Sequence, residues 1–242
     1  SALTNNCEII QYADDICIYR VHENINEGSL DINACLDSVG NWLLDHGFDV
    51  APIKSQVVLF SRKRSPPNIS IVYQGYSIPL VTEAKFLGLI LDAKLTGSAH
   101  VDNTVKKCEK NINVLRALSG TWWGAHPYSQ KLLYNALVRS IIDFGSIFLQ
   151  TSTKSILSRL DSVQFKALRI VLGAMKSSPT RALQVESAEP PLSLRRQYLS
   201  DRYTLRLAQI HPNAIISKLS ALQNCMTSNF WNSREQPCLI KS

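Results

Sequence analysis

The sequence predicts an α+β protein in which a strand-rich first part precedes an all-helical second part. Short apolar runs separated by turn residues dominate the first 97 residues, and beyond them apolar residues recur every three or four positions. The charge changes at the same place: the first 97 residues carry seven Lys and Arg against eleven Asp and Glu, and the rest carry nineteen against eight. We therefore expect three segments, 1–97, 98–212 and a C-terminal tail over 213–242.

Length and composition are those of a globular protein, with 242 residues and a hydrophobic fraction of 45%. No apolar run approaches the roughly 20 residues that span a bilayer, so we expect a soluble, intracellular protein without a membrane partner, nuclear or cytoplasmic. Six cysteines form no C-x-x-C pair, which predicts free thiols in place of disulfides or a zinc site. The net charge of +7 indicates either a polyanion partner or a generally basic, solvated helical surface.

The first predicted element is a β-hairpin centred on the segment Tyr12–Asp15. The flanking runs 8–11 and 16–19 are apolar and rich in isoleucine, as in paired strands. The adjacent carboxylates of Asp14 and Asp15 repel each other at such a turn unless a cation neutralises them. Hard oxygen ligands suit Mg²⁺ or Mn²⁺. The alternative is an ordinary solvated turn, because aspartate favours turns through local hydrogen bonds.

An amphipathic helix is predicted over 29–46, with Trp42 on its buried face and Gly47 at its end. Four strands are predicted after it, over 55–60, 69–73, 76–80 and 85–92. The second and third form a hairpin because Gln74-Gly75 separates them. Gly88 interrupts the last strand and indicates a bulge or a close backbone approach. These strands are expected to form a small antiparallel sheet.

Four helices are predicted in the second part. The first begins near Ser98, and its stripe consists of Val101, Val105, Cys108, Ile112 and Leu115. The second spans Pro127 to Gly145, and its apolar face consists of Leu133, Leu137, Ile141 and Phe144. The third ends at Gly173, and its face consists of Leu157, Leu160, Gln164, Leu168 and Val171. The fourth spans about 191–210. Trp122 and Trp123 are expected to pack in the core or at a domain interface, with stacking on nucleic-acid bases as the alternative.

Over about residues 7–210 the order of the motifs resembles the reverse transcriptases of non-LTR (LINE-like) retrotransposons. The segment Tyr12–Asp15 resembles the Y-A-D-D metal-binding motif of that family, and 86–92 is similar to its F-L-G-x-x-L-D segment. Lys54-Ser55 resembles the end of the family's N-P-x-K-[TS] run, although Ala51-Pro52 replaces the usual asparagine-proline start.

The resemblance continues through the helical part. Residues 133–145 are similar to the run L-Y-x-A-L-[IV]-R-S-[IV]-[IL]-[DE]-Y-G of such elements, and 164–174 are similar to Q-x-x-A-L-R-x-x-x-G-A. Segment 180–196 also matches at Glu186, at Pro190-Pro191-Leu192 and at Arg195-Arg196. The resemblance implies the C-terminal portion of a polymerase palm followed by a helical thumb.

Roles for individual residues also follow from the resemblance. It implies that Asp14 and Asp15 ligate Mg²⁺ (or Mn²⁺), that Tyr12 packs beside the template-primer, and that Lys54 protonates the leaving pyrophosphate in two-metal phosphoryl transfer. It further implies that the primer end is supported by Phe86, Leu87 and Gly88. The implied partners are an RNA template and a DNA primer. Basic residues on the predicted helices are expected to contact phosphates of the RNA–DNA hybrid, namely Lys106, Lys107, Lys110, Arg139, Lys166, Arg169, Arg195 and Arg196.

Reverse transcriptases take a further metal-binding aspartate, a nucleotide-selecting segment and the fingers from sequence before Y-A-D-D. Only eleven residues precede Tyr12 here. We therefore expect the front of the palm and the fingers to be supplied in cis or in trans, and we expect this chain alone to be inactive as a polymerase. The alternative function is a non-catalytic RNA- or DNA-binding helical module.

Overall fold

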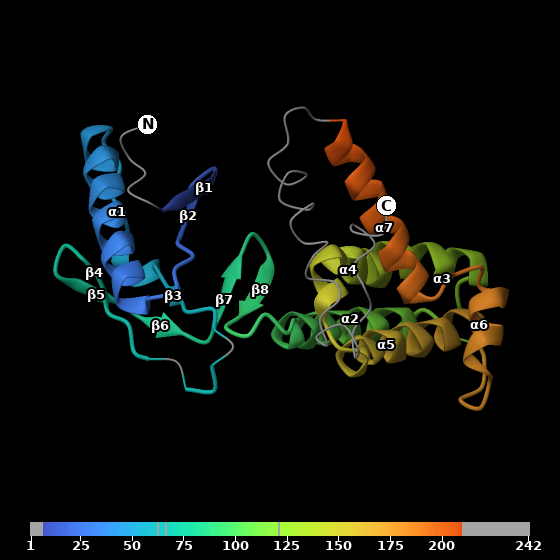
Figure 1. Ribbon diagram of the computed structural model, residues 1–242. Coiled ribbons are helices and arrows are strands. Elements are labelled where there is room, and N and C mark those ends of the chain that lie inside the picture. The colour runs from blue at the N-terminus through green and yellow to red at the C-terminus, as the bar shows by residue number, and fades with distance from the viewer. Residues whose placement is uncertain (1–6, 62, 66, 121, 210–242) are drawn as a thin grey trace. The chain divides into compact units, whose positions relative to one another are not determined.

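The computed structural model in Figure 1 describes residues 7–61, 63–65, 67–120 and 122–209. The chain divides into two compact units between Leu95 and Thr96, called here the first and second units. The predicted α+β class is confirmed, because two-stranded sheets are followed mostly by helices. The predicted tail over 213–242 lies outside the described residues. Among the described helices, none combines the length and apolar character needed to cross a membrane.

The first unit begins with the predicted hairpin. Strands β1 (Glu8–Tyr12) and β2 (Asp15–Tyr19) pair antiparallel, and Tyr12 lies opposite Asp15. Helix α1 (Ile25–Asp45) packs against the hairpin through Cys35 and Val39, which contact Ile9 and Ile18. The hairpin and the first helix therefore share one small core.

Helix α1 begins four residues earlier than predicted because Asn24 caps it. The Asn24 side chain accepts a hydrogen bond from the Asn26 N–H and donates one to Glu27, so both ends of this Asn-x-x-Glu pattern stabilise the first turn. Gly47 follows the helix with a φ of 78°, as expected of a residue that ends a helix. The prediction for Trp42 is wrong: its side chain is 43% exposed and lies beside the ring of His46.

The other strands form separate pairs and not the predicted antiparallel sheet. The pairs are β3 (Val57–Val58) with β6 (Leu80–Val81), β4 (Ile71–Tyr73) with β5 (Tyr76–Ile78), and β7 (Glu83–Phe86) with β8 (Leu89–Asp92). The first pair is parallel, and the other two are hairpins. The predicted hairpin at Gln74-Gly75 is confirmed. A second core cluster joins Ile71 and Tyr73 to α1 through Leu36.

The single strand predicted over 85–92 is wrong, because the chain reverses at Leu87-Gly88. Both residues have positive φ, 45° and 86°, as the two central residues of a type I′ hairpin turn require. Gly88 therefore serves a turn and not a bulge. The apolar residues on both sides concealed the turn in the sequence, because Leu is an uncommon residue at positive φ.

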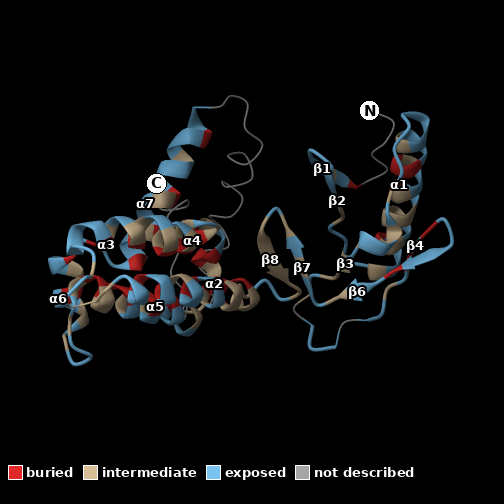
Figure 2. Ribbon diagram, turned by 180° about the vertical axis from the view of Figure 1, so that it is seen from behind, coloured by how far each residue is buried: buried red, intermediate tan, exposed pale blue. Residues whose placement is uncertain are grey.

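The second unit consists of helical segments. The segments are α2 (Ser98–Ala117), α3 (Pro127–Tyr134), a π-helical turn (Asn135–Arg139), α4 (Ser140–Asp143), a 3₁₀ helix (Ser146–Thr151), α5 (Lys154–Leu172), α6 (Thr180–Glu186) and α7 (Leu192–Ala208). Figure 2 shows buried residues gathering where α2, α4 and α5 lie together. The stripes predicted for α2 and α5 lie on this core, including the buried Gln164. The α6 helix was not predicted.

The face predicted for the second helix is wrong by one position. The fully buried residues are Tyr134 and Val138, and Ile142 is 3% exposed, whereas Phe144 is 53% exposed. Of the expected residues, Leu133 and Ile141 lie only at the edge of the core, and Leu137 is half-buried. Both sets repeat every four residues across the π-helical turn, so spacing alone did not distinguish them.

Candidate metal and nucleic-acid sites

The acidic turn stands at the tip of the β1–β2 hairpin. Ala13 and Asp14 form the two-residue loop between the paired residues Tyr12 and Asp15. Ala13 has a φ of 53°, in the left-handed region that costs energy for residues other than glycine. The Gln11 side-chain amide donates a hydrogen bond to the Ala13 carbonyl at 3.2 Å. Strain of this kind concentrates at functional sites, so the loop conformation is consistent with a functional turn.

The alternation of side chains separates the two faces of the hairpin. Ile9 and Ile18 face α1, so Tyr12 and Asp15 lie on the opposite face. Asp14 and Asp15 are both exposed, and the Tyr12 side chain is 66% exposed. The carboxylates are therefore accessible to a cation, and an aromatic ring lies uncovered beside them.

The two aspartates provide part of a metal site. In the described ranges, no group of three or more His, Cys, Asp or Glu side chains is placed to hold an ion. Mg²⁺ is usually bound by one or two protein carboxylates together with water and substrate phosphates. Asp14 and Asp15 therefore fit the part of the coordination sphere that a protein commonly supplies.

Lys54 and the 86–88 turn lie in separate elements of the first unit. Lys54 is exposed at the end of a 3₁₀ turn, Pro52–Lys54, so its amine keeps its hydration, whereas an acid role is favoured by desolvation. Leu87 is 41% exposed at the tip of the β7–β8 hairpin, and Phe86 pairs with Leu89 at its base. The roles given to these residues stay predictions.

Helix α2 presents a cationic surface. Lys106, Lys107 and Lys110, called here the lysine row, are exposed on the side opposite the buried stripe that includes Cys108. Asn103, Glu109 and Asn113 lie beside them on the same helix. Among the described residues, none of the three lysines forms an ion pair with an acidic side chain. Their charges are therefore available to an external anion.

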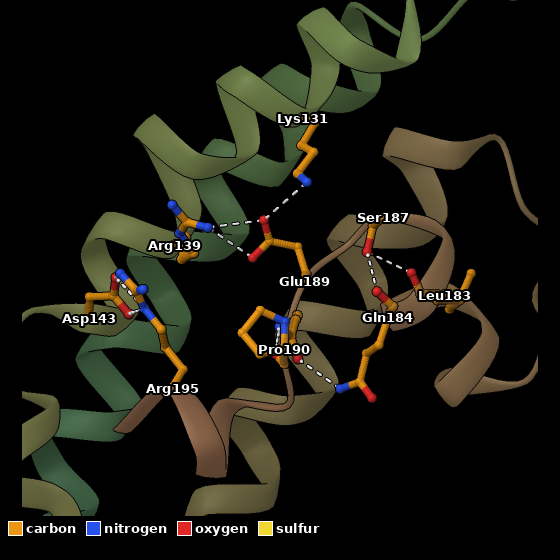
Figure 3. A network of polar contacts seen from close by, with 10 residues as sticks. Lys131, Arg139, Asp143, Leu183, Gln184, Ser187, Glu189, Pro190 and Arg195 are labelled. Carbon is orange, nitrogen blue, oxygen red and sulfur yellow. Dashed lines mark hydrogen bonds and ion pairs between the residues drawn. The ribbon is translucent and has the colours of Figure 1, made fainter. Parts of the chain in front are cut away.

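The predicted arginines of the second unit are occupied differently (Figure 3). Arg139 Nη1 lies 3.0 Å from both carboxylate oxygens of Glu189, whose side chain is 2% exposed, and Lys131 approaches the same group at 3.8 Å. Arg195 Nη2 lies 2.7 Å from Asp143 Oδ2, and its Nε also donates to this carboxylate. This hydrogen bonding raises the pKa of Arg195. The charges of both arginines are already balanced inside the unit.

The remaining predicted basic residues are also less available than the lysine row. Arg196 is 5% exposed, and Arg169 is half-buried. Lys166 Nζ lies 3.3 Å from Glu109 Oε1. The structure thus brings three of the eight predicted residues together as exposed, unpaired cations. Phosphate contacts by the other five stay predictions.

Two features of the second unit were not recognised from the sequence. Glu189 and Asp143 anchor the arginines, and no local signal reveals pairs that are about fifty residues apart in the chain. Trp122 and Trp123 are 97% and 71% exposed, so packing in the core is wrong for both. Their adjacent positions after α2 were visible in the sequence, but their exposure was not.

Comparison with known proteins finds relatives among polymerases of mobile elements. The RNA-directed DNA polymerase from mobile element jockey of Drosophila melanogaster is 26% identical over 212 residues, which cover 87% of this chain and 23% of the relative. The probable RNA-directed DNA polymerase from transposon BS of the same species is 25% identical over 196 residues, which cover 79% and 22%. The jockey polymerase of Drosophila funebris is 23% identical over 212 residues.

This chain spans less than a quarter of the length of these relatives. No model of a known protein family matches it. No solved structure matches it either. The aligned residues nevertheless cover most of the chain, and the motif order led to the same group of proteins. The chain is therefore a distant homologue of the reverse transcriptases of non-LTR retrotransposons.

Proposed function

We propose that this chain forms part of an RNA-directed DNA polymerase, in which the first unit supplies metal ligands and the second unit binds the template-primer. The observation that carries the proposal is the exposed Tyr12–Asp15 turn at the tip of a hairpin, in a chain whose homology to such polymerases includes both units. In this proposal the first unit is the C-terminal portion of the palm, and the second is the thumb.

The proposed chemistry is the addition of a nucleotide to a primer end. Bound Mg²⁺ ions supply activation of the primer hydroxyl and stabilisation of the charge on the departing pyrophosphate. Asp14 and Asp15 hold the cation, and pairing of β1 with β2 fixes the turn that carries them. Tyr12 lies on the same face of the hairpin as Asp15 and packs beside the template-primer. Both acids are exposed, so cation and substrate have direct access.

The second unit contributes nucleic-acid binding through the lysine row. Each phosphate that a lysine neutralises releases condensed counterions, so affinity falls steeply as salt rises and depends little on base sequence. An RNA–DNA hybrid is the expected ligand, because the homologous enzymes are named RNA-directed DNA polymerases. Replacing all three lysines with glutamine is expected to flatten the salt dependence for every nucleic acid tested.

A non-catalytic RNA- or DNA-binding module is the second candidate function. Two observations favour it. The three lysines of the lysine row are free to bind an anion, whereas Asp14 and Asp15 alone are fewer than the three side chains of a complete protein metal site, and no such group of three occurs in the described ranges. Charge changes in the lysine row affect binding under both proposals. The metal site distinguishes the proposals, because the binding module has no use for one.

Mn²⁺ binding to the intact chain tests the metal site directly. Titration followed by water-proton relaxation is expected to show saturable binding that the double variant Asp14→Asn, Asp15→Asn loses. The double variant Asp37→Asn, Asp45→Asn is the charge-matched control, because both residues are exposed on α1 in the same unit. Equal binding by the two variants would reject the site and leave the binding-module proposal.

Primer extension tests the catalytic role. Synthesis on an RNA template is expected only when the chain is joined to, or mixed with, the preceding polymerase region of a relative such as jockey. Asp14→Asn is then expected to abolish synthesis and leave hybrid binding within about twofold of the unsubstituted chain. Synthesis by the chain alone that requires Asp14 would show that it needs no added region.

A further inference from the structure

Residues 118–120 and 122–126, which lie between α2 and α3, close back on the end of α2. The Ala125 N–H donates to the Leu118 carbonyl at 2.9 Å, and the Gly124 N–H donates to the Gly120 carbonyl at 2.7 Å. The Gln130 side chain, from α3, also donates to the Leu118 carbonyl at 2.7 Å. Contacts from both helices therefore hold the base of the loop.

Glycine is required where the loop crosses itself. A Cβ on Gly124 would lie 2.1 Å from the Gly120 carbonyl oxygen, which backbone atoms could not relieve without moving. The Trp123 ring lies over Gly120, where a Cβ would come within 2.5 Å of ring atoms. This tight closure fixes the position from which the two tryptophans project.

The loop exposes much more aromatic surface than folding alone explains. Trp122 is 97% exposed and Trp123 is 71% exposed, although tryptophan is highly buried on average. Two adjacent exposed indoles on a closed loop form a surface that favours binding a flat, apolar group. We call Trp122 and Trp123 the tryptophan pair.

The lysine row lies on α2, and the tryptophan pair lies in the connection that follows α2 in the chain. Lys110 lies seven residues before Ala117, the last residue of α2, which corresponds to about 10 Å along the axis. Stacked nucleotides advance about 3.4 Å each, so roughly three nucleotides cover that distance. Cations that pair with a phosphate backbone and aromatic rings that stack on bases are the two components of sites for single-stranded nucleic acid.

We propose that the tryptophan pair stacks on unpaired bases of a single-stranded nucleic acid whose phosphates lie on the lysine row. This inference rests on the proposed nucleic-acid binding and adds a preference for strand form. A blunt duplex keeps all base faces except those of its two end pairs stacked inside, so along its length it can use the lysines but not the indoles. The unpaired stretch of a template beside the hybrid is the ligand of this kind that a polymerase would offer.

Binding of the intact chain to two labelled ligands tests the inference. Fluorescence anisotropy is measured with a 12-nucleotide single-stranded RNA and with a blunt 12-base-pair RNA–DNA hybrid, at the same salt concentration. The double variant Trp122→Ala, Trp123→Ala is expected to weaken binding of the single strand about tenfold or more and binding of the hybrid less than twofold. Trp122→Phe with Trp123→Phe is expected to restore most of the loss, because phenylalanine still stacks.

Two control variants separate this inference from the proposed function. Trp42→Ala removes a partly exposed tryptophan in the first unit and is expected to leave both affinities unchanged. Replacing Lys106, Lys107 and Lys110 with glutamine is expected to weaken the binding of both ligands to similar degrees. If the lysine variant loses affinity for the single strand but the variant Trp122→Ala, Trp123→Ala does not, the inference is overturned and the proposed nucleic-acid binding is supported. No loss with either variant overturns both.

Two further measurements cover a folding failure of the double variant and binding to a membrane surface. Trp122→Ala alone repeats the test if the double variant fails to fold, because Trp122 is almost fully exposed and Trp123 lies over Gly120. Vesicles containing phosphatidylserine are tested in parallel, since exposed Trp and Lys also suit a membrane surface. Loss of vesicle binding with unchanged single-strand binding would identify a membrane contact and overturn the inference.

Discussion

The two units use acidic residues in opposite ways. In the first unit, Asp14 and Asp15 are exposed at a hairpin tip, and neither forms an ion pair with another described residue. In the second unit, Glu189 is 2% exposed and contacts Arg139 and Lys131. Asp143 likewise forms an ion pair with the guanidinium of Arg195. Buried acids with matched cations stabilise a fold, whereas exposed adjacent acids leave their charge available to a ligand.

Two arginines in the motifs of the helical unit belong to ion pairs inside that unit. Arg139, Asp143 and Arg195 lie in segments that resemble the reverse-transcriptase family, and the sequence led us to expect nucleic-acid contacts from both arginines. Their carboxylate partners instead join α4 and the preceding π-helical turn to the chain around the start of α7. A motif residue can therefore mark a shared fold and need not mark a shared reaction.

Removing the most buried acid is expected to have the largest effect. Glu189→Gln leaves Arg139 and Lys131 facing a neutral group, and breaking such a pair costs about 3 kcal/mol of unfolding free energy. Both cations are about a quarter exposed, which places the loss at the lower end of the range for buried pairs. Urea unfolding of the second unit, followed by circular dichroism, measures it.

Glu186 is the matched control for Glu189, since it is exposed and only three residues away. Glu186→Gln is expected to change the unfolding free energy by less than about 0.5 kcal/mol. Similar losses at the two positions would contradict the distinction between paired and free acids.

Asparagine substitutions compare the two kinds of acid directly. Asp143→Asn removes the charge that Arg195 contacts through both Nε and Nη2, with an expected loss of about 2 kcal/mol. Asp14→Asn and Asp15→Asn are expected to change stability by less than about 0.5 kcal/mol, because solvent already surrounds both groups. Thermal unfolding of the three variants at one pH measures the difference. A large loss at Asp14 would indicate a structural role for the turn.

The sequence contained enough local information for the hairpin, α2 and α5. Asp14 marked the β1–β2 turn, and the stripe that includes Cys108 and the face that includes Gln164 were placed on the core side. The start of α1 was placed four residues late, although Asn24 and Glu27 have the spacing of a capping box. These features depend on residues a few positions apart, where spacing and side-chain chemistry are sufficient.

Features that depend on distant contacts were not predictable in the same way. Arg139 and Glu189 are fifty residues apart, and nothing near either residue identifies its partner. At the π-helical turn the buried residue is Val138 and not the predicted Leu137. Both residues belong to sets spaced by four, so the spacing in the sequence fits either set. The candidate site shows the same limit: Asp14 could be chosen from its neighbours, whereas the availability of Lys106 depended on burial and pairing.

A pH titration examines a buried titratable group of the helical unit. Burial lowers the pKa of His100 from its ordinary 6.5, and Lys107 acts in the same direction, while a hydrogen bond with the Phe144 backbone opposes the shift. The unfolded chain therefore binds a proton at a higher pH than the folded chain. Unfolding free energy is expected to fall as pH decreases from 7 through 6.5 toward the folded pKa. His100→Gln is expected to lose that part of the dependence, and an unchanged profile would contradict the assignment.

The smallest expected effect concerns the strained residue beside the exposed acids. Ala13 has a φ of 53°, so Ala13→Gly relieves a left-handed alanine while adding chain entropy to the unfolded state. The two contributions oppose each other, and a net gain of about 0.5 kcal/mol in unfolding free energy is expected for the first unit. Ala34→Gly, at an exposed position of α1, is the matched control and is expected to lose about 1 kcal/mol. A gain in stability accompanied by weaker Mn²⁺ binding would show that the strained loop positions Asp14 and Asp15, whereas unchanged Mn²⁺ binding would show that the aspartates hold the ion without it.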